Sequence, residues 1–114
     1  MEFTVPGPPV PKERPRRGPH GNFYTPKRTK DAEAQIAMIA RSKSVRFAGN
    51  NVRVELEFFC RQWRGDGDNC EKLILDALQK ADVITNDKQV HECRWRVYLD
   101  PAIEERTVVK VEKM

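Results

Sequence analysis

The stretch from residue 52 to residue 58 alternates strictly between apolar and charged side chains. The apolar positions are Val52, Val54, Leu56 and Phe58, with Arg53, Glu55 and Glu57 between them. Successive side chains of a β-strand point to opposite faces, so this period of two predicts a strand with one face in a core and the other in water. The fold must therefore cover one face of the sheet that contains this strand.

Two other segments have apolar residues at helical spacing. The first should begin with Thr25 as its cap and Pro26 as its first residue, and should end near Ser42 or Lys43. Its apolar positions are Ala32, Ile36, Ile39 and Ala40. Residues three and four apart lie on one side of a helix, so this segment is expected to present a single apolar face.

The second predicted helix follows the alternating strand and runs to about Lys80. We expect Asp68 to be its N-cap, with Glu71 three residues later completing a capping box. The apolar stripe consists of Cys70, Leu73, Ile74, Ala77, Leu78 and Ala81. Such a stripe is typical of a helix that packs one face against a core.

Three further strands complete the predicted fold. They are residues 2 to 5, residues 90 to 99 with Cys93, Trp95 and Val97 alternating, and a last strand through Thr107, Val109 and Val111 after a turn at Asp100 and Pro101. The order is β-α-β-α-β-β. These elements most simply make an α+β fold, a two-layer sandwich of one mixed four-stranded sheet with two helices on one face. A chain of 114 residues is expected to form one domain, residues 1 to 114.

The N-terminal part is rich in proline and in basic residues. Prolines interrupt any ladder between residues 6 and 19, so we expect an extended or looped, mobile arm at about residues 6 to 24. Residues 1 to 30 hold seven Lys and Arg against two Glu, whereas residues 31 to 114 hold fourteen against fifteen acidic residues. The basic residues are Lys12, Arg14, Arg16, Arg17, Lys27, Arg28 and Lys30. They would attract a polyanion such as DNA, although a solvated basic tail fits the charge equally well.

The three cysteines, Cys60, Cys70 and Cys93, are far apart and include no C-x-x-C pair. An odd number without such pairs favours buried thiols in a reducing compartment over a disulfide framework. No apolar run approaches the roughly twenty residues of a membrane span, and the proline-rich start lacks the apolar core of a signal peptide. We expect a cytoplasmic protein with no membrane partner.

Asp66 and Asp68 flank Gly67 between the alternating strand and the second helix, and Asp87 lies in the turn before the next strand. Adjacent carboxylates repel each other, and a shared cation relieves the repulsion. Oxygen ligands suit Mg²⁺, with Mn²⁺ also possible. The three positions can meet only if the second helix returns the chain to the same edge of the sheet. The alternative is a helix cap, a solvated acid and an ordinary turn.

Other metal sites fit the sequence poorly. Cys70 and Glu71 occupy positions where a calcium loop of the EF-hand type needs an Asp or Asn and a Gly. A zinc site lacks paired ligands, because His91 and Cys93 stand alone and are expected to line the core from one face of their strand.

Lys72 falls four residues after Asp68, off the apolar stripe of the second helix. With Asp76 and Lys80 it would make a ladder of ion pairs at helical spacing. A functional alternative is that its ammonium contacts the phosphate to be cleaved and stabilises developing negative charge. The helix alone does not decide between these roles.

Several spaced motifs resemble the RusA family of Holliday-junction resolvases. They are the run from Asp66 to Lys72 (D-G-D-N-C-E-K), the run L-D-A-L at residues 75 to 78 and the run from Asn86 to Val90 (N-D-K-Q-V), against a family pattern of D-x-D-N-x-x-K, D-A-L and a D-D-x-Q-V-like turn. Segments at residues 5 to 12, 14 to 16 and 24 to 26 extend the similarity over nearly the whole chain. The chain departs from this pattern at two positions. Gly67 stands where an apolar residue is usual, and the missing side chain should loosen the site. Asn86 stands where relatives often have an acid.

The resemblance implies that Asp66, Asp68 and Asp87 bind the metal, that Lys72 is the catalytic lysine and that the protein is a homodimer. It also implies an endonuclease of DNA recombination and repair, which resolves four-way (Holliday) junctions by paired, symmetrical, metal-dependent nicks without a small-molecule cofactor. The basic arm would hold phosphates, and Phe23 and Tyr24 would pack either on an opened base or in the core. A non-catalytic DNA-binding module and a nuclease for flaps or single strands are the alternatives.

Overall fold

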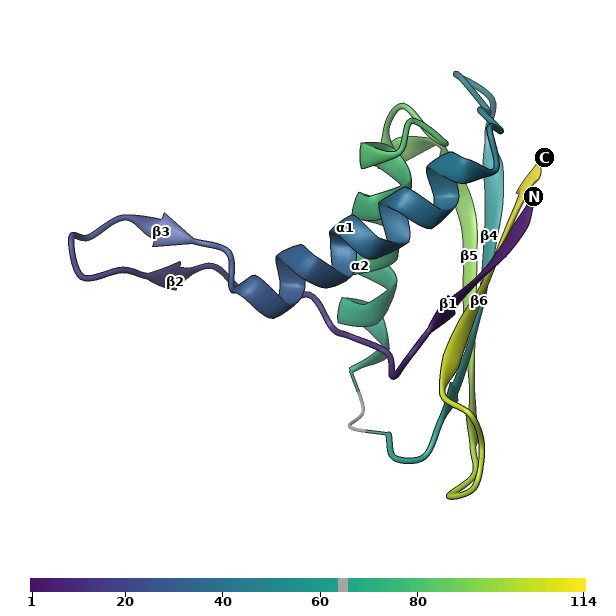
Figure 1. Ribbon diagram of the computed structural model, residues 1–114. Coiled ribbons are helices and arrows are strands. Elements are labelled where there is room, and N and C mark those ends of the chain that lie inside the picture. Colours follow the sequence, from purple (N-terminus) through teal and green to yellow (C-terminus); the bar gives the residue numbers. More distant parts are fainter. Residues whose placement is uncertain (64–65) are drawn as a thin grey trace.

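The computed structural model describes residues 1 to 63 and 66 to 114, and forms two layers (Figure 1). One layer is a four-stranded sheet in the order β1-β6-β4-β5. These strands are β1 (Glu2–Pro6), β6 (Arg106–Lys113), β4 (Val52–Cys60) and β5 (Val90–Leu99). Strand β6 is antiparallel to both β1 and β4, and β4 is parallel to β5. The predicted mixed sheet and α+β class are therefore confirmed.

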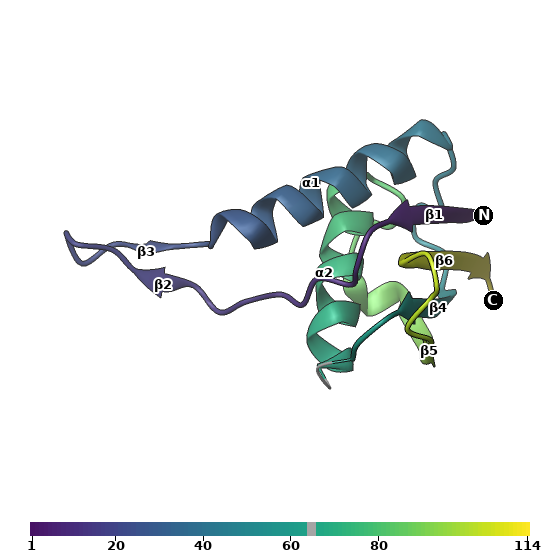
Figure 2. The same cartoon turned by 60° about the horizontal axis from the view of Figure 1, so that its bottom comes forward.

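Both long helices, α1 (Lys27–Ser42) and α2 (Gly67–Lys80), cover the same face of this sheet (Figures 1 and 2). In β4 the predicted alternation holds along the whole strand, with the odd-numbered positions half-exposed. Its inward side chains pack with the α2 stripe, where Leu73 and Leu78 are fully buried. Neither helix is long and apolar enough to span a membrane, and the same holds for every other helix in the described part of the chain.

The two helices begin at other residues than predicted. Pro26, rather than Thr25, is the N-cap of α1. Helix α2 begins two residues earlier than an Asp68 cap would allow: its N-cap is Asp66, and the backbone N–H of Cys70 donates to the Asp66 carbonyl over 3.1 Å. Asp68 is thus inside the first turn, and the predicted Asp68–Glu71 capping box is wrong.

A capping box does form in the turn before β5. A short 3-10 helix, η1 (Asp87–Gln89), has Asn86 as its N-cap, and the Asn86 side chain accepts from the N–H of Lys88 over 2.9 Å. In return the Gln89 side chain accepts from the N–H of Asn86 over 3.0 Å, and its amide donates to the Asn50 carbonyl over 2.8 Å. Gln89 is buried and ties the turn that carries Asp87 to the loop before β4.

The alternation predicted for β5 is interrupted at its start. Val52 pairs with Val90 but Arg53 pairs with Glu92, so a bulge takes His91 out of register. His91 is exposed, against the prediction that it lines the core, and Cys93 is half-buried. The prediction of buried thiols is confirmed for Cys60 and Cys70.

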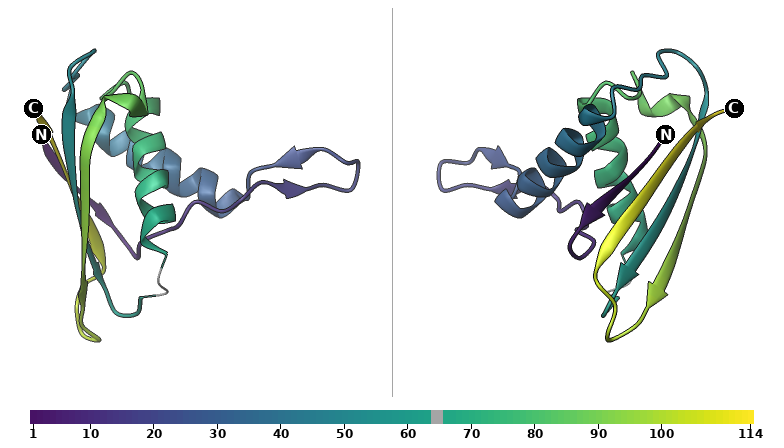
Figure 3. Two further views of the ribbon diagram at one scale, coloured as in Figure 1. Left: turned by 180° about the vertical axis from the view of Figure 1, so that it is seen from behind. Right: turned by 45° about the vertical axis from the view of Figure 1, so that its right-hand side comes forward.

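The basic arm contains a hairpin that the proline pattern did not predict. Strand β2 (Arg16–Arg17) pairs antiparallel with β3 (Phe23–Tyr24), and the hairpin projects away from both layers (Figures 1 and 3). Phe23 is 74% exposed and Tyr24 is 48% exposed, so these rings do not pack in the core.

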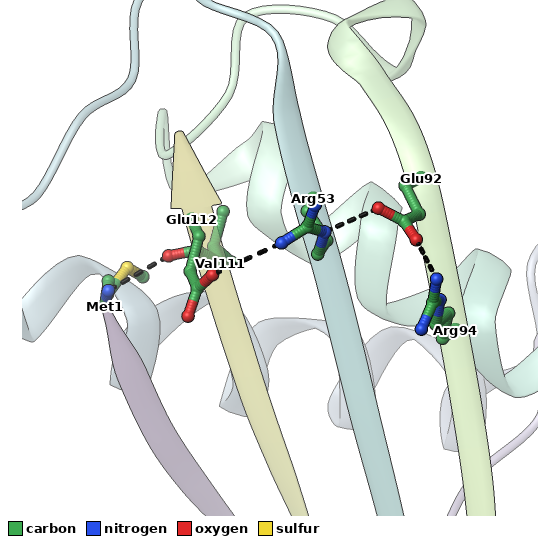
Figure 4. A network of polar contacts seen from close by, with 6 residues as sticks. All are labelled: Met1, Arg53, Glu92, Arg94, Val111 and Glu112. Atoms are coloured by element: carbon green, nitrogen blue, oxygen red, sulfur yellow. Dashed lines mark hydrogen bonds and ion pairs between the residues drawn. The ribbon is translucent and has the colours of Figure 1, made fainter. Parts of the chain in front are cut away.

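Part of the sheet face opposite the helices carries a network of ion pairs. Arg53 lies between Glu92, at 2.5 Å, and Glu112, at 3.8 Å, while Arg94 contacts the second oxygen of Glu92 at 2.5 Å (Figure 4). The bond from Arg53 is the main reason that the pKa of Glu92 lies below its usual value. These pairs join β5, β4 and β6 across the exposed face, consistent with the charged half of the alternation in β4.

Candidate active site

Asp66 and Asp68 lie at the start of α2, which faces the end of β4 where the strand leaves the sheet (Figure 1). Both side chains are exposed. The N-terminus of a helix carries partial positive charge, which favours carboxylates and phosphates there. The start of α2 therefore presents two acids and a local preference for anions at one edge of the molecule.

Neither carboxylate makes a side-chain hydrogen bond or an ion pair to another described residue. In particular, Asp66 makes no side-chain cap bond. The neighbouring thiol stays neutral, because burial and then the charge of Asp66 raise the pKa of Cys70 to about 11. The donors are thus carboxylate oxygens alone, and Mg²⁺ is often held by one or two carboxylates plus water and substrate phosphate. The pair fits such an ion.

Gly67, between the two acids, is pressed against an indole ring. A Cβ built on Gly67 would lie 2.3 Å from Cζ2 of Trp95, closer than any real contact. The Trp95 ring lies 6.0 Å from Trp63 and 6.5 Å from Phe58, centre to centre. Trp95 thus fills the space that a larger residue at position 67 would need, and the absence of an apolar side chain there leaves no gap.

Lys72 is exposed on the second turn of α2, one turn beyond Asp68. The predicted ladder through Asp76 does not form. Asp76 instead contacts Nζ of Lys12 at 2.5 Å, and the backbone N–H of Lys12 donates to the Asn69 carbonyl over 2.9 Å. Asp76 therefore anchors the basic arm to α2, and Lys72 forms no ion pair among the described residues.

Asp87 lies at the opposite end of α2 from this pair. Because β4 and β5 are parallel, the residues that follow β4 and those that precede β5 lie at opposite ends of the strands. Helix α2 has 14 residues, which separates its ends by about 20 Å. Across the described residues, no three His, Cys, Asp or Glu side chains gather closely enough to hold one metal ion. One chain alone does not bring the three aspartates together.

A cleft of about 320 Å³ opens beside Asp66. Its lining residues are Pro8, Pro9, Pro11, Arg28, Gln62, Trp63, Asp66, Cys70 and Glu105. Arg28 on α1 thus faces the same space as Asp66, and it is the member of the predicted basic set that lines this cleft.

The other basic residues of that set are placed differently. Arg16 and Arg17 are on the projecting hairpin, and Arg16 contacts Glu13 at 3.1 Å. Arg14, Lys27 and Lys30 are exposed near the base of the hairpin. The arm therefore carries its cations from the edge of the acidic site out to the hairpin.

Two residues near the site were missed from the sequence. Gln89 fixes the Asp87 turn, and the Asn86-x-x-Gln89 spacing is a capping-box signal that could have identified it. Trp95 contacts Gly67 from a strand 28 positions later in the sequence. No local pattern predicts such a contact.

An exposed pair of acids at a helix start, bordered by cationic side chains, is an arrangement suited to metal-assisted hydrolysis of a phosphodiester. Comparison with protein families agrees with this class: the model of the RusA family, described as endodeoxyribonuclease RusA, matches residues 6 to 112. The chain belongs to this family of endodeoxyribonucleases. None of the curated proteins matches the chain.

Proposed function

We propose that this protein is a Mg²⁺-dependent endodeoxyribonuclease that resolves four-way DNA junctions by paired, symmetrical nicks, in recombination and repair. The observation that carries the proposal is the exposed Asp66–Asp68 pair at the start of α2 in a chain of the RusA family. In the part of the chain that the structure describes, neither carboxylate makes an ion pair, and Asp66 makes no side-chain cap bond. A shared cation would relieve their repulsion and would bring phosphate to the same helix end.

In this proposal, Asp66 and Asp68 hold the divalent ion, with Mn²⁺ as a possible substitute. A bound ion of this kind would supply a more acidic water and positive charge beside the phosphate, and hydrolysis would leave a 5′-phosphate and a 3′-hydroxyl. The Lys72 ammonium lies one helix turn from Asp68 and points its charge toward solvent at the same end of α2. It would donate hydrogen bonds to the phosphate oxygens on which negative charge develops.

The position of Asp87 suggests how a dimer would work. We infer that the protein is a homodimer in which Asp66 and Asp68 of one copy act with the partner subunit's Asp87. Two copies related by a two-fold axis can place opposite ends of two sheets side by side, and this arrangement creates two identical sites. Two sites related by symmetry are also what two opposed nicks in a four-way junction require.

The basic arm is the proposed DNA contact. Arg28 shares a cleft with Asp66, and Arg16 and Arg17 extend the positive surface along the hairpin. Cations in these places would hold phosphates without reading bases, so affinity should fall steeply as salt rises. A non-catalytic binding module would gain nothing from two acids beside these cations, because carboxylates repel phosphate.

The test is cleavage of a labelled four-way junction and of linear duplex, each with and without Mg²⁺. We expect paired nicks in the junction only, dependent on Mg²⁺, and none with Asp66→Asn. Asp82→Asn is the matched control, since Asp82 is an exposed acid with φ of 60°, which Asn tolerates.

Other results would decide against parts of the proposal. Equal cleavage by the parent and Asp66→Asn would show that the site is wrong. Cleavage of flaps or single strands in preference to junctions would favour the alternative nuclease. Binding of junctions without any cleavage would favour the non-catalytic module.

A further inference from the structure

The projecting hairpin has a defined shape at its tip. The N–H of Gly18 donates to the Asn22 carbonyl over 2.7 Å, and the N–H of Gly21 donates to the Gly18 carbonyl over 3.1 Å. Gly21 has φ of 80°, a conformation that favours glycine. The tip is therefore a hydrogen-bonded turn, and Figure 3 shows the hairpin extending well beyond the two layers in both views.

The base of the hairpin is fixed to the end of α2 that carries the acidic pair. The N–H of Lys12 donates to the carbonyl of Asn69, the residue directly after Asp68, and the Lys12 ammonium contacts Asp76. The N–H of Glu13 donates to the hydroxyl of Thr29 on α1 over 3.3 Å. The six or so residues from there to the tip span about 20 Å when extended. DNA held on the hairpin would therefore be held at a set distance from the acidic pair.

The side chains on the hairpin combine cations with exposed rings. Arg17 pairs across the strands with Phe23, and Arg16 pairs with Tyr24. Phe23 is the most exposed of the large apolar side chains in the described part of the chain, at 74%. An apolar ring on a basic, projecting element suits a polyanion that also offers an apolar flat surface. A nucleic acid with an accessible base has both.

A benzyl ring has no hydrogen-bonding groups, so Phe23 cannot read the edges of paired bases in a groove. It can stack on the face of a base, but in linear duplex those faces are covered by neighbouring pairs. At the branch point of a four-way junction the continuous stack is broken. We propose that Phe23 stacks on a base exposed at the branch point, with Arg16 and Arg17 on the flanking phosphates. The hairpin then selects branched over linear DNA, an inference that rests on the proposed function.

The test measures binding in EDTA, so that no cleavage occurs, to an immobile four-way junction and to linear duplex with the same arm sequences. The Phe23→Ala protein cannot stack on a base, so it should bind the junction about tenfold more weakly than the parent does. Its affinity for duplex should change less than twofold. Phe23→Trp should restore junction binding because it restores the ring. Met38→Ala, which removes a side chain that is 64% exposed on α1, is the matched control and should bind as the parent does.

Each other outcome overturns the inference. Unchanged junction binding by Phe23→Ala would show that the ring does not stack, and equal losses on junction and duplex would place the hairpin in a groove. If sedimentation equilibrium gave a lower molar mass for Phe23→Ala than for the parent, the ring would be part of a contact between two protein chains. Failure of the proposed function is distinguishable, because the parent itself would then show no preference for the junction in binding and no nicks with Mg²⁺.

Discussion

Gly67→Ala should destabilise the protein, although alanine is normally the better helix residue. The added Cβ would lie 2.3, 2.5 and 2.7 Å from three atoms of the Trp95 indole, whereas ordinary contacts begin near 3.4 Å. The ring must therefore move by about 1 Å, which disturbs its packing with Phe58 and Trp63. Overpacking of this kind costs about 1 to 3 kcal/mol. Alanine recovers at most about 1 kcal/mol in helix propensity.

We expect a net loss of about 1 kcal/mol in the free energy of unfolding of Gly67→Ala, because overpacking against the Trp95 ring, which is 40% exposed, outweighs the gain in helix propensity. For a chain of this size that lowers Tm by about 4 to 8 °C. Urea unfolding followed by far-ultraviolet circular dichroism measures it without depending on the indole. Gly49→Ala is the matched control, because nothing lies within 4 Å of a Cβ at Gly49, and it should change stability by less than about 0.5 kcal/mol.

A double-mutant cycle isolates the cause. In a Trp95→Ala background the new Cβ meets no ring, so Gly67→Ala should cost nothing and can become favourable. The two substitutions should therefore couple by about 1 to 3 kcal/mol. An unchanged penalty in the Trp95→Ala background, or a Gly67→Ala protein as stable as the parent, would refute the packing argument.

Three other substitutions test separate parts of the fold. Gln89→Ala removes the four hydrogen bonds that this buried side chain makes and should lower the free energy of unfolding by about 3 kcal/mol in urea titration; a loss under 0.5 kcal/mol would contradict that role. Glu92→Gln removes a carboxyl whose pKa is lowered mainly by its bond to Arg53. The stabilisation that Glu92 gives is therefore present above the usual pKa of 4.5 and is lost as the pH falls through the lower folded-state pKa. The Tm difference between parent and Glu92→Gln should shrink from pH 6 to pH 3, and a constant difference would oppose this. Asp76→Asn breaks the contact with Lys12; Tm should change little, but trypsin should cut the hairpin faster, and an unchanged rate would show that the pair does not anchor the arm.

Local periodicity predicted those elements whose burial depends on their own residues. Strand β4 and the α2 stripe are examples, since alternation and helical spacing directly specify which side chains are covered. The start of α2 was mispredicted because Asp68 has the side chain of a good cap, but the first turn is already closed by the carbonyl of Asp66. The bulge at His91 and the β2–β3 hairpin depend on register and on the tip turn, which a simple pattern of apolar and polar residues does not encode.

The candidate site divides in the same way. Asp66 and Asp68 are neighbours in sequence, so their proximity at the start of α2 could be predicted from the motif. The position of Asp87 could not be predicted, because the end of the sheet at which it lies depends on whether β5 is parallel or antiparallel to β4. The packing of Trp95 on Gly67 depends on tertiary structure alone.

The central claim, that acids from opposite ends of two sheets form one site, is tested most directly by mixing two inactive variants. The Asp66→Asn and Asp87→Asn proteins are unfolded together, refolded as a mixture and assayed with Mg²⁺. The substrate is a four-way junction that already has one nick, so that a single further cut resolves it. In a shared site, the mixed dimer has one site with all three aspartates intact, so the mixture should recover cleavage while each variant alone stays inactive. If all three aspartates act within one chain, every site in the mixture lacks an aspartate, and a mixture as inactive as its components would contradict the account.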